Sequence, residues 1–199
     1  KENYDSYIYI KYHGRLVTQK GISVLARAAE KLLSNNAPVR FIFIGQGQAN
    51  FEEEFASLSK KYDSKCVFFR GYDRFLSRLC MASADFAVFP SFFEPCGLED
   101  FIAQIYGTIP VAHATGGLQK IINAETGFLY KSNNFEELYA LLNSLIKIQL
   151  HTKRNFFHTM ISYAANYVRK NYSWDIVVKE KYIPLYKSLV QVASDSKSV

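Results

Sequence analysis

Residues 86–117 read FAVFPSFFEPCGLEDFIAQIYGTIPVAHATGG, and this stretch decides the fold. It opens with a short apolar run, takes on a helical period after Gly97, and ends in a second short run, at residues 109–112, that is rich in β-branched residues. A strand, a helix and a second strand in this order form a parallel pair joined by a crossover helix. We therefore predict a parallel sheet with helices on both of its faces.

The same alternation extends in both directions along the chain. The predicted strands are Tyr7–Tyr12, Arg40–Ile44, Lys65–Phe69, Phe86–Phe89, Ile109–Ala112 and Gly127–Tyr130. The predicted helices are Ile22–Ser34, Phe51–Lys61, Arg74–Met81, Leu98–Tyr106, a short one near Gln119–Ile122, and then Phe135–Leu150, Arg154–Asn171 and Trp174–Val192. The chain thus reads as one doubly wound α/β domain over residues 1–193, with a flexible polar tail at 194–199.

Composition restricts the class of partner. The 199 residues carry a formal net charge of +6, but no run of five like charges occurs, so charge alone selects no partner. The most basic stretch, residues 147–154, lacks the interleaved aromatic residues of a single-strand nucleic-acid binder. No apolar segment approaches the roughly 20 residues of a membrane span. We expect binding neither to nucleic acid nor to a membrane.

The spacing of the cysteines and histidines bears on the cellular compartment and on metal binding. The three cysteines, at 66, 80 and 96, show no CxxC spacing and leave an odd thiol, which favours a reducing compartment. The cytoplasm is the expected location, or the plastid if the source is a plant or alga. The four histidines lack metal-ligand spacing, so we expect no zinc site.

Glycine-containing loops follow five of the predicted strands. In open parallel sheets ligands bind outside the carboxyl ends of the strands, and glycine lets backbone amides approach an anion closely. The loops read HGRLVTQKG at 13–21, GQG at 45–47, GYD at 71–73, SFFEPCG at 91–97 and TGG at 115–117. Each is a candidate anion site.

Arg15 and Lys20 stand in the first of these loops, where two cations could converge on a diphosphate. A basic pair in a loop is more commonly a solvated surface feature. Gly21 follows Lys20 where a P-loop has Ser or Thr, and Asn50 interrupts the dinucleotide pattern that Gly45 begins. An NAD-dependent enzyme is therefore disfavoured, and the absence of a G-x-S-x-G sequence argues against a serine hydrolase.

Glu94 precedes the predicted helix at 98–106, where its carboxylate could accept hydrogen bonds from sugar hydroxyls or serve only as a helix cap. Thr115, Gly116 and Gly117 have a shape suited to backbone contact with a phosphate or sugar, and equally to a tight turn. Tyr72 could stack on a nucleobase, although most aromatic residues pack in a core.

Taken together, the order and the sequences of these loops resemble those of the C-terminal domain of glycogen and starch synthases, glycosyltransferase family 5. The similarity runs from Gly14 to Tyr186. It is most specific at Phe93-Glu94-Pro95-Cys96-Gly97-Leu98, Tyr106–Val111 and Ala114–Leu118, and Cys96 points to the synthases among related transferases. The resemblance implies a Rossmann-like lobe of a two-lobed GT-B enzyme, with an N-terminal acceptor lobe outside this chain.

The resemblance also implies roles. The enzyme would be a retaining α-1,4-glucan synthase that transfers glucose from ADP-glucose or UDP-glucose to glycogen or starch without a metal or other cofactor, and the α-glucan would bind through the other lobe. Arg15 and Lys20 would offset the diphosphate charge, and Glu94 would face the donor glucose. The other donor-binding residues would be Gly14, Tyr72, Cys96, Gly97, Leu98, Thr115, Gly116 and Gly117.

Four departures from the family pattern leave a second hypothesis open. Phe92 and His113 stand where Arg is usual, Glu99-Asp100 replaces Thr-Gln, and Gln119-Lys120 replaces Ala-Asp. Two cations are lost and two carboxylates gained near the phosphate site, so weak donor binding is expected. A degenerate domain that retains the fold for glucan binding or regulation is the alternative. A family 4 transferase is disfavoured, because Ile102 stands where that group usually has a second Glu.

Overall fold

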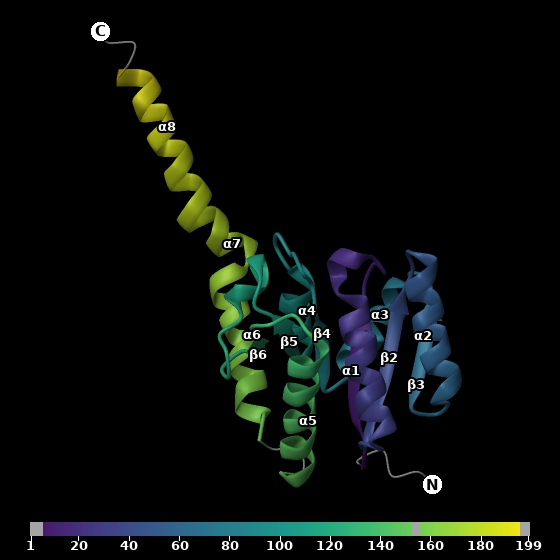
Figure 1. Ribbon diagram of the computed structural model, residues 1–199. Coiled ribbons are helices and arrows are strands. Elements are labelled where there is room, and N and C mark those ends of the chain that lie inside the picture. The colour runs from purple at the N-terminus through teal and green to yellow at the C-terminus, as the bar shows by residue number, and fades with distance from the viewer. Residues whose placement is uncertain (1–5, 153–155, 196–199) are drawn as a thin grey trace.

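The structure is a computed structural model that describes residues 6–152 and 156–195. Six strands form one sheet in the order β3-β2-β1-β4-β5-β6, and every neighbouring pair is parallel (Figure 1). The strands are β1 (Ile8–His13), β2 (Val39–Gly45), β3 (Cys66–Arg70), β4 (Phe86–Phe89), β5 (Ile109–His113) and β6 (Phe128–Tyr130). The strand order reverses between β1 and β4, which is where sheets of this kind bind ligands.

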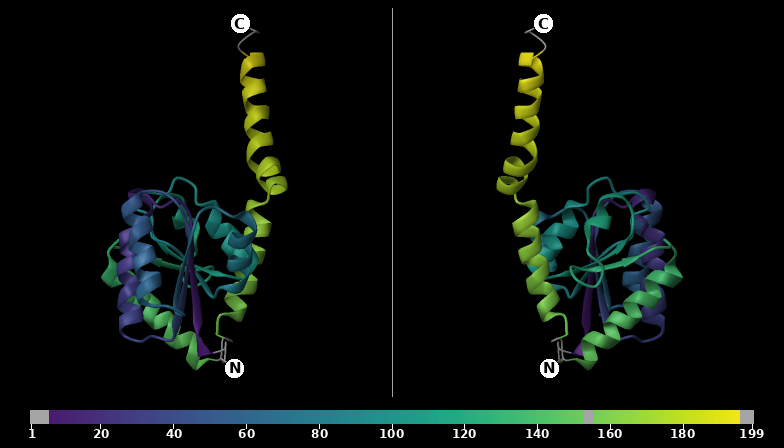
Figure 2. Two further views of the ribbon diagram at one scale, coloured as in Figure 1. Left: turned by 90° about the vertical axis from the view of Figure 1, so that its right-hand side faces the viewer. Right: turned by 90° about the vertical axis from the view of Figure 1, so that its left-hand side faces the viewer.

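Helices cover both faces of the sheet. On one face α1 (Ile22–Ser34) packs against α2 (Ala49–Lys61) and α5 (Phe135–His151). On the other, α4 (Leu98–Tyr106) packs against α3 (Arg74–Ser83) and α6 (His158–Tyr172), as Figure 2 shows. The predicted doubly wound α/β fold is confirmed.

Side-chain periodicity explains this packing. Buried residues of α1 recur at helical spacing, at Ile22, Leu25, Ala29 and Leu32, and they join the core formed by Ile8 and other strand residues. The central strands are buried on both faces, as in β4, where Phe86, Ala87 and Val88 are each no more than 1% exposed. Each fully buried large apolar side chain contributes roughly 1.5–3 kcal/mol to folding.

The predicted elements differ from the observed ones mainly at their ends. The short helix expected near Gln119–Ile122 is a 3-10 helix, η3 (Gly116–Lys120), because the amide of Ile121 bonds back three residues to Leu118 and the chain then extends. The predicted start of a helix at 154 lies outside the described residues, and α6 begins at His158. The first loop also contains a 3-10 turn, η2 (Thr18–Lys20).

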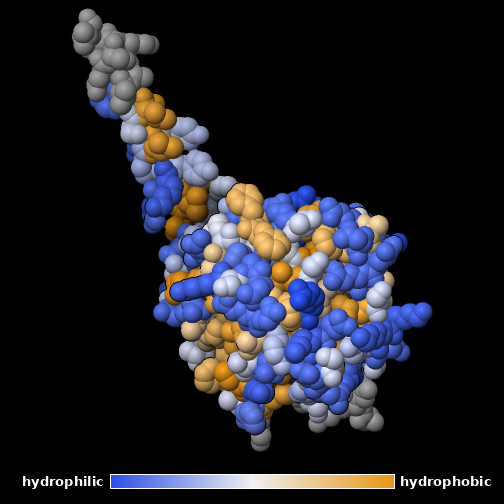
Figure 3. Space-filling model, viewed as in Figure 1, coloured by the Kyte–Doolittle hydropathy of each residue, from blue (hydrophilic) through white to orange (hydrophobic). Residues whose placement is uncertain are grey.

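The C-terminal segment is helical throughout its described part. A single π-helical stretch, η4 (Val178–Tyr182), joins α7 (Trp174–Val177) to α8 (Ile183–Asp195), and the resulting rod projects away from the sheet (Figures 1 and 2). The predicted tail at 194–199 therefore begins too early, since residues 194 and 195 still belong to α8, and residues 196–199 lie outside the described part. Exposed apolar side chains, among them Leu185 and Leu189, lie along this rod (Figure 3).

Candidate functional site

Two adjoining cavities lie at the carboxyl ends of the central strands. The larger, about 300 Å³, is lined by His13, Gly14, Arg15, Gly45, Gln46, Gly71 and Tyr72. The smaller, about 120 Å³, is lined by Tyr12, His13, Gly14, Lys20, Phe89, Ser91, Glu94, Gly97, Leu98, Glu99, Asp100 and Leu118. Because His13 and Gly14 line both, the two cavities meet at the end of β1, next to the reversal of strand order.

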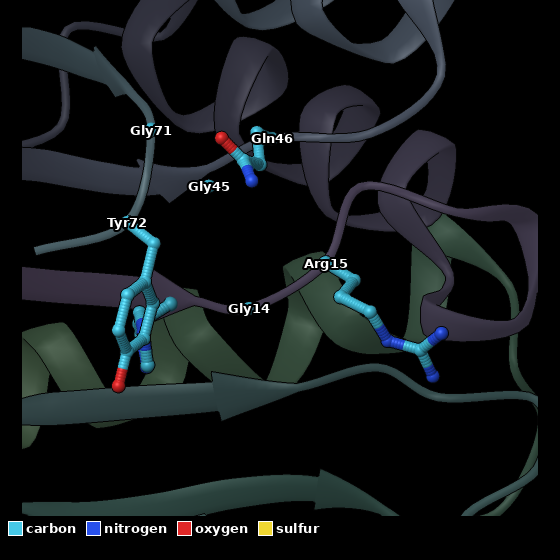
Figure 4. A pocket seen from close by; sticks show the side chains of 7 residues that line it. Gly14, Arg15, Gly45, Gln46, Gly71 and Tyr72 are labelled. Carbon is cyan, nitrogen blue, oxygen red and sulfur yellow. The ribbon is translucent and has the colours of Figure 1, made fainter.

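The larger cavity brings together residues from three strand ends. Figure 4 shows Tyr72 and Arg15 on opposite sides of Gly14, with Gln46 between them on a third side. The Tyr72 ring is 67% exposed and lies beside the His13 ring, with centroids 5.8 Å apart. An exposed aromatic face next to polar groups can stack on a planar ring such as a base.

Arg15 and Lys20 do not line the same cavity. Arg15 borders the larger cavity, whereas Lys20 borders the smaller one with Glu94. The two cations therefore lie in neighbouring cavities and do not converge on one point. This arrangement suits an elongated anion that passes from one cavity into the other.

Gly21 fixes Lys20 beside the β4 exit. Its φ of +65° is in the left-handed region, and a Cβ on it would lie 1.9 Å from the carbonyl oxygen of Pro90. The amide of Phe92 donates to Gln19 (2.9 Å), and the Gln19 side chain donates to the Phe93 carbonyl (3.0 Å). Only glycine permits this close contact, so the two loops form one wall.

Lys20 and Glu94 form an ion pair on that wall. Ser91 Oγ also donates to the Glu94 carboxylate, at 3.2 Å. The side chains of Lys20 and Glu94 are only 21% and 15% exposed. A partly desolvated cation and carboxylate thus face the smaller cavity together.

The Thr115-Gly116-Gly117 turn supports the Glu94 loop from behind. The Gly117 amide donates to the Glu94 carbonyl (2.7 Å), and Thr115 Oγ1 donates to the Phe92 carbonyl (3.2 Å). A Cβ on Gly116 or Gly117 would lie 2.1 Å from the carbonyl oxygen of Glu94 or Cys96, respectively. Loop packing therefore explains the glycine pair, and direct contact of these three residues with a ligand stays a prediction.

The first turn of α4 borders the smaller cavity. The cavity is lined by Gly97, which precedes the helix, and by Leu98, Glu99 and Asp100. The Leu98 side chain is exposed. Cys96 is also exposed, but it does not line this cavity. The two carboxylates lie at the positive end of the helix, where they would compete with a bound anion.

Each of these carboxylates, however, has a cationic partner within the chain. Arg78 of α3 donates to both carboxylate oxygens of Glu99, at 2.9 and 3.4 Å, and His13 Nδ1 lies 3.7 Å from Glu99 Oε2. Burial would raise the pKa of Glu99, but the nearby His13 ring and the hydrogen bonds and charge of Arg78 outweigh it and lower that pKa to about 2. The negative charge of Glu99 is therefore compensated locally.

Asp100 is fully buried and pairs with Lys120, whose Nζ lies 2.9 Å from Oδ1. Burial raises the pKa of Asp100 to about 6, although the charge and hydrogen bond of Lys120 oppose the shift. At neutral pH the carboxylate is ionised and neutralised by the lysine. The like-charge repulsion inferred from sequence is thus compensated at both positions.

The structure adds two residues that loop reading missed as site residues, Arg78 and Lys120, and it places His13, at a strand exit, in the lining of both cavities. Arg78 lies on a helix and gave no sequence signal, because pairing with position 99 depends on the packing of α3 beside α4. Lys120 was visible only as a departure from the family pattern. His13 ends β1, and its position between the two cavities follows from the strand order.

The two positions where arginine is usual contribute little to the cavities. The His113 ring lies between backbone carbonyls, with Nδ1 2.8 Å from Ser91 O and Nε2 3.1 Å from Lys131 O. Phe92 is 50% exposed, and neither residue lines either of the two adjoining cavities.

A buried lysine lies beneath the site. Lys11 of β1 is 1% exposed and donates to the Ser77 carbonyl at 3.1 Å. Burial lowers its pKa to about 8, while Glu99 opposes the shift.

Two features are absent from residues 6–152 and 156–195. Within them, no cluster of three or more His, Cys, Asp or Glu side chains is arranged to hold a metal ion. Over the same residues, no helix has both the length and the apolar character to span a bilayer.

Comparison with known proteins finds a matching family and several similar proteins. Residues 1–166 match the family described as glycosyl transferases group 1. The glycogen synthase of Thermodesulfovibrio yellowstonii is 36% identical over 182 residues, which cover 91% of this chain and 35% of that protein. The chain thus spans about a third of the length of this curated relative.

Solved structures show the same fold. The catalytic domain of starch synthase IV from Arabidopsis thaliana, bound to ADP and acarbose, aligns with a TM-score of 0.75 and 24% identity, over 94% of this chain and 39% of that one. The C-terminal domain of a glycosyl transferase group 1 family protein from Francisella tularensis aligns with a TM-score of 0.68 and 20% identity, over 84% and 87%. The Francisella tularensis structure contains a C-terminal domain alone, and the alignment covers most of it.

Proposed function

The chain belongs to the family of group 1 glycosyl transferases, and we propose that it is the donor-binding half of a retaining α-1,4-glucan synthase. The donor would be ADP-glucose or UDP-glucose, and the acceptor the non-reducing end of glycogen or starch. Similarity to glycogen synthases at 33–36% identity supports the reaction class. Because the chain spans only about a third of those proteins, the acceptor site would belong to the remaining two thirds.

The observation that carries this proposal is the pair of adjoining cavities. The larger offers the exposed Tyr72 ring and the Gln46 amide, which suit a nucleoside. The smaller offers the Lys20 ammonium, the Glu94 carboxylate and the N-terminal turn of α4, which suit a phosphate joined to a sugar. A nucleoside diphosphate sugar has these parts in this order.

Each group then has a task. Arg15 borders the larger cavity and Lys20 borders the smaller one. Both side chains would stabilise the charge that develops as the nucleoside diphosphate departs. Together with the amide end of α4 they would supply positive charge without a metal ion. The Glu94 carboxylate would accept hydrogen bonds from glucose hydroxyls and face the positive charge of an oxocarbenium-like transition state.

The Lys20–Glu94 pair implies an ordered exchange of partners. In the structure each neutralises the other. A bound donor would present a phosphate to Lys20 and hydroxyl groups to Glu94, so both side chains would keep a partner of suitable polarity. The desolvated pair is then a preorganised site rather than an obstacle to binding.

A transfer assay tests the proposal. Radiolabelled glucose from ADP-glucose or UDP-glucose should enter glycogen when the full-length parent enzyme is supplied, and not when the 199-residue chain is supplied alone, because the acceptor wall is missing. Transfer by the isolated chain at the rate of the parent would contradict the two-lobe assignment. Lack of transfer by the parent with either donor would contradict the glucan synthase assignment.

A degenerate synthase-like domain in glucan binding or regulation is the second candidate. The observation that favours it is that Phe92 and His113, at positions where arginine is usual, leave Arg15 and Lys20 as the arginine and lysine side chains that line the two cavities. If this candidate is correct, the chain should bind maltooligosaccharides but neither nucleotide, and affinity electrophoresis in glycogen would separate the two cases.

A further inference from the structure

The Lys120 ammonium group lies inside a cage of four oxygen atoms. Its Nζ is 2.9 Å from Asp100 Oδ1, 2.7 Å from the carbonyl oxygen of Cys96, 2.5 Å from that of Gly97 and 2.8 Å from that of Gly117. A lysine ammonium has three N–H donors, so the oxygens outnumber the hydrogens. An oxygen shell of this kind surrounds a cation by charge rather than by directed hydrogen bonds alone.

The cage is shielded from solvent. Asp100 is 0% exposed and the Lys120 side chain is 16% exposed. The ammonium group also lies over the Phe101 ring, 4.3 Å from its centroid. Three carbonyl oxygens and a carboxylate that converge in a partly buried space would repel one another if the positive charge were absent.

The cage joins the two turns behind the smaller cavity. Cys96 and Gly97 lead into α4, whose first turn lines that cavity, and Gly117 donates its amide to the Glu94 carbonyl. The same ammonium group bonds to both turns. Its position therefore affects where Glu94 and the start of α4 lie.

We propose that Lys120 is a positioning residue whose ammonium group fills a built-in monovalent-cation site, and that filling this site holds the Glu94 turn in its donor-binding position. When the side chain is shortened, a free cation of similar size, ammonium or potassium, enters the cage. The cation site itself does not depend on the proposed function. The effect of this site on donor binding rests on the proposed function.

The first test measures stability. Lys120→Ala in the 199-residue chain should lower Tm by an amount on the order of 10 °C, because it leaves Asp100 buried without its counter-charge. Ammonium or potassium chloride should restore several degrees relative to tetramethylammonium chloride at the same ionic strength, since the larger cation does not fit. The exposed Lys147→Ala variant is the matched control and should show no such difference between salts. Equal Tm values for Lys120→Ala in all three salts would overturn the cation-site proposal.

A second measurement needs no substitution. In the unaltered chain, ¹⁵N-labelled lysine should give a slowly exchanging ammonium NMR signal that Lys120→Arg removes, beside any signals from the shielded Lys11 and Lys20, which Lys120→Arg should leave in place. If Lys120→Arg removes no slowly exchanging ammonium signal, the cage is open to solvent and the proposal fails. This measurement decides the question even if Lys120→Ala does not fold.

The donor arm uses calorimetry with ADP on the same variants. We expect Lys120→Ala to lose at least ten-fold in ADP affinity in tetramethylammonium chloride and to recover it in ammonium chloride. If the unaltered chain binds ADP and Lys120→Ala binds it equally well in both salts, the positioning role is overturned. If the unaltered chain binds no ADP, the proposed function and the positioning role fail together, while Tm and the NMR signal still judge the cage.

Discussion

Lys20 and Glu94, which are 74 residues apart in the sequence, form an ion pair on the wall of the smaller cavity. The pair exists because Gly21 brings the first loop against Pro90 at the end of β4. The Lys20 ammonium group suits a phosphate, and the Glu94 carboxylate suits the hydroxyl groups of a sugar. The position of the pair at the reversal of strand order links the fold directly to the proposed chemistry.

Removing either cation should impair transfer. In the full-length parent, Lys20→Ala and Arg15→Ala should each lower kcat/KM by roughly 10²-fold or more, about 2.7 kcal/mol, because each stabilises the departing diphosphate. Lys147→Ala, on an exposed position of α5, is the control and should be neutral. Unchanged kinetics in both site variants would return Arg15 and Lys20 to the status of ordinary loop charges.

Neutralising Glu94 should separate chemistry from nucleotide binding. Glu94→Gln should nearly abolish glucose transfer but keep ADP affinity, because we assign the carboxylate to the sugar. The exposed Glu136→Gln is a matched control of the same chemistry on α5. An ADP affinity that falls with Glu94→Gln while the circular dichroism spectrum stays unchanged would contradict the assignment.

The doubly wound sheet could be predicted from the sequence because the signals that define it are local. Each strand is a short apolar run, and each helix has an apolar period that can be read within about ten residues. The loops at 13–21 and 91–97 were expected at one edge for the same reason. Helix ends were less accurate, because they depend on single hydrogen bonds such as that from Ile121 to Leu118.

The charge balance of the site could not be predicted from the sequence, because it depends on tertiary contacts. Glu99 and Asp100 read as two unpaired carboxylates, and their partners Arg78 and Lys120 lie 21 and 20 residues away on other elements. From the sequence, the glycine pair at 116–117 suits a ligand-binding turn and a simple tight turn equally. Its close contact with the carbonyls of Glu94 and Cys96 became visible only when the two loops were placed together.

Asp100→Asn should leave the fold at least as stable at pH 7. The substitution keeps the shape of the side chain, and the raised pKa of Asp100 means that burial favours its uncharged form over the ionised one. Urea denaturation at pH 7 would measure the change. Asp175→Asn, near the start of the projecting rod, is the control and should change the free energy of unfolding by less than about 0.5 kcal/mol. A loss of about 3 kcal/mol or more for Asp100→Asn would mean that pairing with Lys120 stabilises the charge of Asp100 by more than burial opposes it.

The two carboxylates should affect acid stability in opposite directions. The pKa of Glu99 is lowered from 4.5 to about 2, so the unfolded chain binds more protons in that range, and the stability Glu99 provides is lost as pH falls from 4.5 to 2. The pKa of Asp100 is raised from 3.8 to about 6, so its contribution is present below 3.8 and is lost as pH rises through 6.

Denaturation curves of Glu99→Gln against pH would check the first effect. The variant should lose less stability than the unaltered chain between pH 4.5 and 2, and the two curves should run parallel above pH 5. Parallel curves over the whole acid range would show that Arg78 and His13 do not hold Glu99 in its ionised form.

We expect the two adjoining cavities to bind a nucleoside diphosphate sugar. Isothermal titration of the 199-residue chain with ADP, UDP and ADP-glucose, beside the Lys20→Ala and Lys147→Ala variants, would test this expectation. We expect saturable one-to-one binding of at least one nucleotide, weakened at least ten-fold by Lys20→Ala and left unchanged by Lys147→Ala. Absence of binding for all three compounds, or equal binding by the Lys20→Ala variant, would contradict it.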